Sequence, residues 1–184
     1  MNDISRCVVK KDHRSKMDGS ALYVADFPAE GMLFGKLIRS PHAHAKVLGI
    51  ALPALPEGYF TVDWRDFPGE NRVHIVKDDT PVFAEDTVAY IGDPLLMIVG
   101  PEEQTVEQLA NETVVQYQPL PAVLDVRQAE TVFFDYQFGR GDVAAAMAQA
   151  DQVFEEEFET GYQEQAYLET QGLIAEFLDG KLTL

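Results

Sequence analysis

The stretch Thr87-Val-Ala-Tyr-Ile-Gly-Asp-Pro-Leu-Leu-Met-Ile-Val99 decides the fold, because it joins two apolar runs through a turn signal. We expect strands over residues 87–91 and 95–99, since the second run is apolar throughout and both are short. The intervening Gly-Asp-Pro tripeptide is typical of a tight turn. The stretch therefore predicts a strand, a turn and a buried strand.

A helix is expected immediately after this unit. Pro101 stands where the first helical turn needs no N–H, and two glutamates follow it near the positive end of the helix dipole. Val106, Leu109 and Ala110 repeat at helical spacing and form one apolar face. A strand is expected next, over residues 114–117. Since the segment between the two strands is long enough for a crossover, we predict a β-α-β unit.

Two further strands are expected upstream, on either side of a proline-containing loop. Residues 31–38 and 45–50 are largely apolar, and the segment 39–44 between them reads Arg-Ser-Pro-His-Ala-His. Pro41 prevents a helix in this loop and lacks a donor for a strand ladder. A short strand is expected at residues 59–62.

A second motif opens after a linker-like region. Asp142 is a good helix N-cap, and apolar residues follow at helical spacing over residues 143–150. A strand is expected over residues 152–160, with Phe154 and Phe158 on one face.

The last residues predict a hairpin. Asp179-Gly180 stands between two apolar runs, and both central positions of a type I′ turn need positive φ angles. Only four residues of the returning strand follow this turn. We therefore expect the chain to be the front part of something larger.

Composition limits the classes of function. The chain has 184 residues, of which 46% are hydrophobic, and a formal net charge of −17. This charge argues against a nucleic-acid or anionic-membrane surface, which needs clustered basic residues. The longest apolar run, residues 95–99, is too short to span a bilayer, and no signal-peptide pattern is present, so we expect a cytoplasmic protein. Cys7 is the single cysteine, which excludes an internal disulfide and any multi-cysteine metal or iron–sulfur site.

His42 and His44 are the first candidate site residues. In an extended segment alternate residues point to the same side, so the two imidazoles could share a metal. No third ligand lies nearby in the sequence, and a structural role in the loop is favoured over a metal site.

Two polar clusters near the end of the chain are further candidates. The acidic run could bind a cation or supply paired acid–base carboxylates, but adjacent strand residues face opposite ways, which favours a solvated strand. The second cluster could line a pocket or brace a domain junction, and bracing is favoured. The acidic run comprises Glu155, Glu156, Glu157 and Glu159, and the second cluster comprises Gln163, Glu164, Gln165 and Glu169.

Familiar catalytic motifs are missing from the sequence. We find no phosphate-binding loop, no dinucleotide fingerprint and no serine nucleophile elbow. An Arg-Gly-Asp tripeptide ends at Asp142, where the N-cap role accounts for the aspartate. The residues by themselves therefore indicate an acidic α+β domain leading into a second one, with no visible catalytic apparatus.

A series of motifs runs through the chain in a constant order. It comprises Lys16-Met-Asp-Gly-Ser-Ala-Leu-Tyr-Val-Ala-Asp26, Gly31-Met-Leu33, Arg39-Ser-Pro-His-Ala-His-Ala45, Asp66-Phe-Pro-Gly-Glu-Asn71, Asp79-Thr-Pro-Val-Phe-Ala84, Val88-Ala-Tyr-Ile-Gly-Asp-Pro94, Tyr117-Gln-Pro-Leu-Pro-Ala-Val-Leu-Asp125, Gly141-Asp-Val143, Phe158-Glu-Thr160 and Gln163-Glu-Gln-Ala-Tyr-Leu-Glu-Thr170. Together these motifs resemble the molybdenum hydroxylases, the family of xanthine dehydrogenase and aldehyde oxidase.

The resemblance implies an α+β fold with an α/β hammerhead domain followed by the truncated start of a molybdopterin-binding domain. The boundaries that we expect are an N-terminal arm over 1–15, the hammerhead over 16–125, a linker over 126–140 and the second domain over 141–184.

The resemblance also implies a reaction, namely hydroxylation of a heterocycle or aldehyde with oxygen drawn from water. The complete enzyme would carry molybdenum–molybdopterin, with iron–sulfur clusters and FAD on other domains or subunits, and no cofactor is expected on this chain alone. In this family the pterin dithiolene holds the metal, and the residues around it lie downstream of Leu184. We therefore expect no catalytic, cofactor-binding or metal residue in this chain, and no activity of the chain alone.

The expected partners are the remainder of the molybdopterin-binding subunit, the iron–sulfur and FAD subunits or domains, and a small-molecule substrate, with no nucleic acid and no membrane. The alternative is a non-catalytic scaffold subunit that docks the remaining molybdopterin-binding chain. Two departures leave the substrate subgroup open. Gln165 replaces the family's usual His, and Asp93 stands where Gln or Glu is common.

Overall fold

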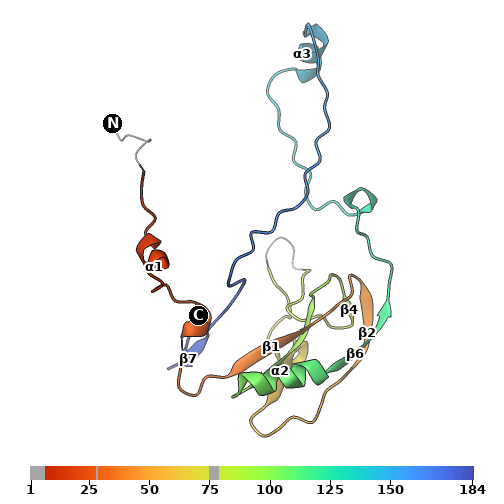
Figure 1. Cartoon of the computed structure of the whole chain (residues 1–184). Helices are drawn as coiled ribbons and strands as arrows, with labels where there is room; N and C mark the ends of the chain where they lie inside the picture. The colour runs from red at the N-terminus through yellow and green to blue at the C-terminus, as the bar shows by residue number, and fades with distance from the viewer. Residues whose placement is uncertain (1–6, 28, 75–78) are drawn as a thin grey trace. The chain divides into compact units, whose positions relative to one another are not determined.

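The computed structural model describes residues 7–27, 29–74 and 79–184 (Figure 1). The chain divides into two units. One unit is Gly31–Tyr136, and the other combines Met1–Glu30 with Gln137–Leu184.

The first sheet of the unit Gly31–Tyr136 contains three antiparallel strands in the order β1-β5-β3. Its strands are β1 (Phe34–Arg39), β5 (Pro94–Gly100) and β3 (Phe60–Asp63). The expected buried strand is therefore confirmed as β5, which pairs on both sides and lies at the centre of this sheet.

The second sheet contains three antiparallel strands in the order β4-β2-β6. They are β4 (Thr87–Val88), β2 (Ala45–Ala51) and β6 (Val114–Pro119). β4 is shorter than the strand expected over residues 87–91. The chain turns early because the Asp93 side chain accepts the Ala89 N–H and the Tyr90 carbonyl accepts the Asp93 N–H.

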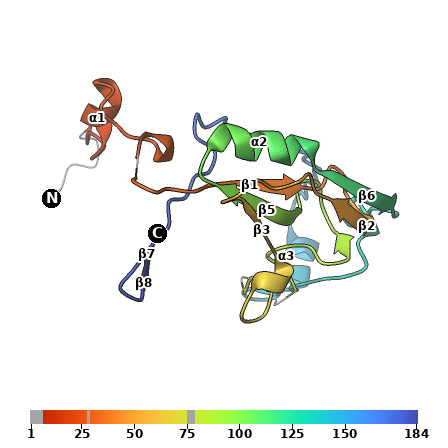
Figure 2. The ribbon, with the colours of Figure 1, turned by 90° about the horizontal axis from the view of Figure 1, so that it is seen from below.

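Helix α2 (Glu103–Glu112) connects β5 to β6 and packs against β1 and β5 with its buried face, formed by Val106 and Leu109 (Figure 2). The helix is confirmed, but the β-α-β unit is wrong. β5 and β6 belong to different sheets, and each pairs only with antiparallel neighbours in the described residues. Helical periodicity predicts the helix but carries no information about which sheet the next strand joins.

β5 contributes to two hydrophobic clusters, because successive strand residues point to opposite faces. Leu95 enters one cluster, and Leu96 and Ile98 enter the other, beneath α2. The buried members of the first are Ala45, Ala84, Val88 and Leu95, and those of the second are Leu96, Ile98, Val106 and Leu109.

The remaining unit contains short elements. They are α1 (His13–Met17), the 3₁₀ turn η1 (Val24–Asp26), α3 (Val143–Gln149), β7 (Glu176–Leu178) and β8 (Lys181–Thr183). Asp142 is the N-cap of α3, as expected, since its Oδ1 accepts the Ala145 N–H at 2.9 Å.

The terminal hairpin is confirmed as well. β7 and β8 pair antiparallel, and Asp179 and Gly180 between them have φ angles of 51° and 76°. Positive φ at both central positions is what a type I′ turn requires. Residues 152–160 form no strand, so that prediction is wrong. The alternating pattern is present, but no segment in the described part of the chain pairs with it.

No helix among the described residues is long and apolar enough to cross a bilayer.

Candidate functional site

The loop after β1 and the turn before β5 are joined by hydrogen bonds from both backbone and side-chain donors. The Arg39 guanidinium donates to the Gly92 carbonyl at 2.8 Å. The Gly92 N–H donates to the Ser40 carbonyl at 2.7 Å, and the Ser40 N–H donates to the Asp93 carbonyl at 2.9 Å. Two motifs that lie far apart in the sequence therefore form one connected structure at the end of the first sheet.

Asp93 is the buried carboxylate of this junction, with 2% of its surface exposed. Its Oδ2 accepts the Ala89 N–H at 2.8 Å. Burial raises the pKa of Asp93 above its ordinary value, and the hydrogen bonds from Ala89 and Tyr90 offset part of that rise. The pKa of Tyr90 is also raised, first by burial and then by the nearby Asp93 charge. The aspartate thus holds the turn closed.

His42 and His44 have different partners. The ring of His42 packs edge-on against Tyr117 with centroids 4.7 Å apart. His44 Nδ1 lies 2.6 Å from the Pro121 carbonyl oxygen, and the His44 carbonyl accepts the Leu120 N–H at 2.9 Å. The pair therefore braces the loop against the end of β6 and does not converge on one point.

Ser40 closes the same loop locally. Its hydroxyl accepts the His42 N–H at 3.0 Å and donates to the His42 carbonyl at 3.1 Å. The hydroxyl of Tyr117 lies in the same region, is buried and has no hydrogen bond of ordinary geometry within the described residues. Burial raises the pKa of Tyr117.

Asn71 is a second buried polar centre, and sequence reasoning missed it. Its Oδ1 accepts the N–H groups of Val82 at 3.1 Å and Phe83 at 3.0 Å. Its Nδ2 donates to the Phe83 carbonyl at 2.7 Å and to Glu85 at 3.2 Å. The amide thus joins two more motif segments. An asparagine after a Pro-Gly turn gives no local signal for this role, because its partners lie at least 11 residues away.

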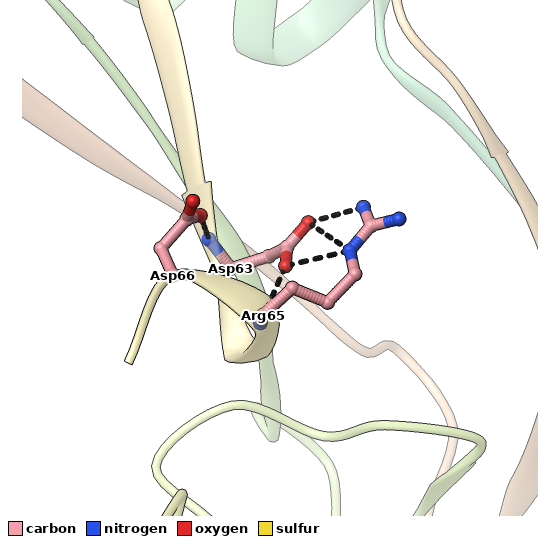
Figure 3. A network of polar contacts seen from close by, with 3 residues as sticks. All are labelled: Asp63, Arg65 and Asp66. Carbon is pink, nitrogen blue, oxygen red and sulfur yellow. Dashed lines mark hydrogen bonds and ion pairs between the residues drawn. The ribbon is translucent and has the colours of Figure 1, made fainter. Parts of the chain in front are cut away.

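An exposed polar network stabilises the 3₁₀ turn η2 (Trp64–Asp66), which follows β3 directly (Figure 3). Asp63 accepts the Arg65 N–H at 2.8 Å and pairs with the Arg65 guanidinium, while Asp66 accepts the Asp63 N–H at 2.7 Å. The side-chain hydrogen bond from Arg65 lowers the pKa of Asp63. These contacts are local and account for the turn without a ligand.

A mostly apolar groove of about 540 Å³ lies beside the His44 loop. Its lining residues are Ala43, His44, Ala89, Tyr90, Ile91, Pro121, Ala122, Val123 and Leu124. The titratable side chains of this lining are His44 and Tyr90, and Nδ1 of His44 already lies 2.6 Å from the Pro121 carbonyl oxygen. No group of His, Cys, Asp and Glu suited to a metal occurs in the described parts of the chain.

Of the polar cluster at residues 163–169, Glu169 contacts a distant segment, whereas Glu164 contacts a neighbouring residue. Glu169 accepts the Val24 N–H on both carboxylate oxygens, at 2.9 and 3.2 Å. Glu164 accepts only the nearby Ala166 N–H, at 3.3 Å. The Glu169 contact lies within one compact unit. The acidic run at residues 155–159 is exposed, in agreement with a solvated segment but without the strand.

The residues after the linker do not fit a molybdopterin group by themselves. Between residues 137 and 184 only Ala145, Glu169 and Ile174 are partly covered, and every other side chain is exposed. A pterin needs a concave site with polar groups that converge on it. We therefore derive no chemical step through this group from the residues of this chain.

Family comparison finds two matches in tandem. The family model described as "Aldehyde oxidase and xanthine dehydrogenase, a/b hammerhead domain" matches residues 18–121. The model described as "Molybdopterin cofactor-binding domain" matches residues 125–184.

Curated relatives agree with these matches. The chain is 32% identical to a probable xanthine dehydrogenase subunit of Bacillus subtilis, with 91% of this chain and 24% of that protein covered. It is 34% identical to a xanthine dehydrogenase of Emericella nidulans, with 85% of this chain and 12% of that protein covered. The chain thus spans about a quarter or less of the length of these relatives.

Solved structures show the same fold. CO dehydrogenase from Oligotropha carboxidovorans matches with a TM-score of 0.55 and 26% identity, covering 64% of this chain and 15% of that chain. Quinoline 2-oxidoreductase from Pseudomonas putida 86 matches with a TM-score of 0.52 and 26% identity, covering 65% of this chain and 17% of that chain.

Proposed function

Because the chain belongs to the molybdenum hydroxylase family of aldehyde oxidase and xanthine dehydrogenase, we propose that it provides the front part of the molybdopterin-binding subunit of such an oxidoreductase. The proposed reaction of the complete enzyme is hydroxylation of a heterocycle or aldehyde with oxygen drawn from water. The observation that carries the proposal is the tandem order of the hammerhead and molybdopterin-binding matches within one chain.

The proposed domain organisation has an arm over 1–15, the hammerhead over 16–125, a linker over 126–140 and the start of the second domain over 141–184. In support, residues 129–142 contain neither helix nor strand. The chain covers 24% and 12% of the length of two relatives, which supports a second domain that is longer in the complete subunit.

The proposed role of this chain is structural support, with the chemistry supplied by the rest of the assembly. Polar side chains around the turn before β5 bind backbone groups: Asp93 accepts the Ala89 N–H, and His44 Nδ1 lies within hydrogen-bond distance of the Pro121 carbonyl oxygen. The second unit exposes large apolar side chains such as Phe154, Phe158 and Tyr162. Such surfaces are typical of regions that other segments cover. We propose that the remainder of the subunit covers them and that iron–sulfur and FAD domains or subunits complete a cytoplasmic enzyme.

A reconstitution experiment tests this proposal. The purified chain is supplied with molybdenum–molybdopterin, and oxidation of xanthine, aldehydes and heterocycles is followed with an artificial electron acceptor. We expect no turnover from the chain alone and turnover when the remainder of the subunit and its redox partners are added. Sustained turnover by the chain alone would overturn the structural role. Failure of the complete assembly on all of these substrate classes would overturn the proposed reaction.

The same preparation distinguishes the scaffold alternative. If the remainder is a separate polypeptide that co-purifies with this chain, the chain acts as a docking subunit. If the two parts form one continuous polypeptide, the scaffold alternative is excluded.

A further inference from the structure

The segment around Val24 contacts a residue near the other end of the chain. The Val24 N–H donates to Glu169, 2.9 Å from Oε1 and 3.2 Å from Oε2, across a separation of 145 residues. Both residues belong to the same compact unit. A hydrogen bond from a backbone N–H to a carboxylate is charge-assisted and about twice as strong as a neutral one.

Gly172 allows a close contact that a side chain at this position would force apart by a small shift. A Cβ atom at position 172 would lie 2.9 Å from Val24 Cβ, 3.0 Å from Val24 Cγ2 and 3.1 Å from Glu169 Oε1. The two separations from Val24 are shorter than the distance of about 3.5–4.0 Å between carbon atoms in van der Waals contact. The glycine therefore serves close packing of Val24 against the segment 169–172.

The turn around Val24 is itself held in shape. The Tyr23 N–H donates to Asp26 Oδ2 at 2.8 Å, and the Asp26 N–H donates to the Tyr23 carbonyl at 2.9 Å. The 3₁₀ turn η1 thus leaves the Val24 N–H unused by its own backbone and available to Glu169. A preformed turn loses less conformational entropy on docking than a flexible segment does.

We propose that residues 21–27 are a clasp for the segment 169–172, so that both ends of the chain form one discontinuous folding unit, with the unit Gly31–Tyr136 inserted between them in the sequence. Glu169 and Gly172 are the positioning residues of this clasp. The proposal concerns how the unit that combines Met1–Glu30 with Gln137–Leu184 folds, and it is independent of the proposed reaction.

Disulfide trapping tests the geometry directly. In the full chain, Cys7→Ser removes the single cysteine, and Val24→Cys with Gly172→Cys places two thiols at the contact. Disulfide-bonded residues have Cβ atoms about 3.8 Å apart, so we expect rapid intramolecular oxidation after a small adjustment. The matched control pairs Val24→Cys with Gly161→Cys, because nothing lies within 4 Å of a Cβ at position 161.

The oxidation rates decide the outcome. The clasp is supported if the 24–172 pair closes at least about ten times faster than the 24–161 pair, a ratio that corresponds to about 1.4 kcal/mol. Equal rates for the two pairs would overturn it.

Hydrogen exchange of the Val24 amide provides a second test that retains the glycine at position 172. Glu169→Ala removes the acceptor, whereas Glu164→Ala removes only the acceptor of the local Ala166 bond. We expect at least about tenfold faster exchange at Val24 in the first variant and no change in the second. Unchanged exchange in Glu169→Ala, with unaltered Trp64 fluorescence as evidence of an intact hammerhead, would contradict the clasp.

Discussion

The buried carboxylate of Asp93 accepts a 2.8 Å hydrogen bond from the Ala89 N–H four residues earlier, and this bond closes the turn between β4 and β5. Burial disfavours the charged form of this carboxylate and therefore raises the pKa of Asp93 above the ordinary value of 3.8. The folded state therefore binds the carboxyl proton of Asp93 more tightly than the unfolded state does. The contribution of Asp93 to stability is greatest at low pH and falls as pH rises from 3.8 through the raised pKa.

The substitution Asp93→Asn tests this relationship. Asparagine keeps an acceptor for Ala89 without the charge, so we expect a higher free energy of unfolding than wild type at pH 7 and no difference at pH below 3.8. Urea unfolding followed by fluorescence of Trp64, the single tryptophan, measures this across the pH range. Asp93→Ala is the control, since it loses the acceptor and should destabilise by about 1–3 kcal/mol. Equal destabilisation by both substitutions at pH 7 would contradict the burial argument.

Asn71→Ala should destabilise the hammerhead strongly. The substitution removes the hydrogen bonds that Nδ2 donates to the Phe83 carbonyl and to Glu85. It also removes the hydrogen bonds that Oδ1 accepts from the N–H groups of Val82 and Phe83. Since an unsatisfied buried group costs about 1–3 kcal/mol, we expect a loss of about 3 kcal/mol or more. Gln104→Ala, on the exposed side of α2, should change stability by less than about 0.5 kcal/mol. The same urea titration compares the two, and a loss for Asn71→Ala no larger than the control would refute this role.

Ile98→Ala probes the core beneath α2. Ile98 is fully buried in the cluster that includes Val106 and Leu109. Truncating a buried isoleucine leaves a cavity and costs about 2–5 kcal/mol. Val114→Ala at the start of β6 is the matched control, because Val114 is 58% exposed and should cost far less. Similar midpoints of thermal unfolding for both variants would show that Ile98 is not central to the core.

Asp142→Ala should loosen α3. The substitution removes the side-chain acceptor of the Ala145 N–H, and loss of an N-cap costs about 1 kcal/mol. We expect about fivefold faster hydrogen exchange at Ala145 and Ala146, measured by amide exchange in the intact chain. Asp142→Asn keeps the acceptor and should preserve the protection. If Asp142→Ala exchanges at the wild-type rate, the cap does not stabilise this helix.

Local elements of the fold are predictable because their causes lie within a few residues. The helix at α2 follows from the spacing of Val106 and Leu109, although it begins at Glu103, so that Pro101 precedes the N-cap Glu102 and does not lie in the first turn as expected. The hairpin follows from Asp179-Gly180. Strand partners are not predictable in the same way. The apolar run of β5 predicts burial but does not distinguish β1 and β3 from β6 as its neighbours.

The candidate site residues also divide into local features that the sequence predicts and distant partners that it does not. The sequence identifies His42 and His44 as a pair, yet only the fold shows that one contacts Tyr117 and the other Pro121. Asn71 carries no signal at all, because a turn asparagine and a buried network asparagine have the same local sequence. A bracing role is expected for Glu169, but its partner Val24 lies 145 residues away.

By itself the sequence determined the family, the helix and hairpin positions and the burial of β5. These depend on motif order, side-chain periodicity and backbone preferences, which all act along the chain. Only the tertiary structure decided that β5 and β6 lie in different sheets, that residues 152–160 form no strand and that Glu169 holds the N-terminal turn. Strand pairing and carboxylate partners depend on which distant segments fold together, and no local preference encodes that choice.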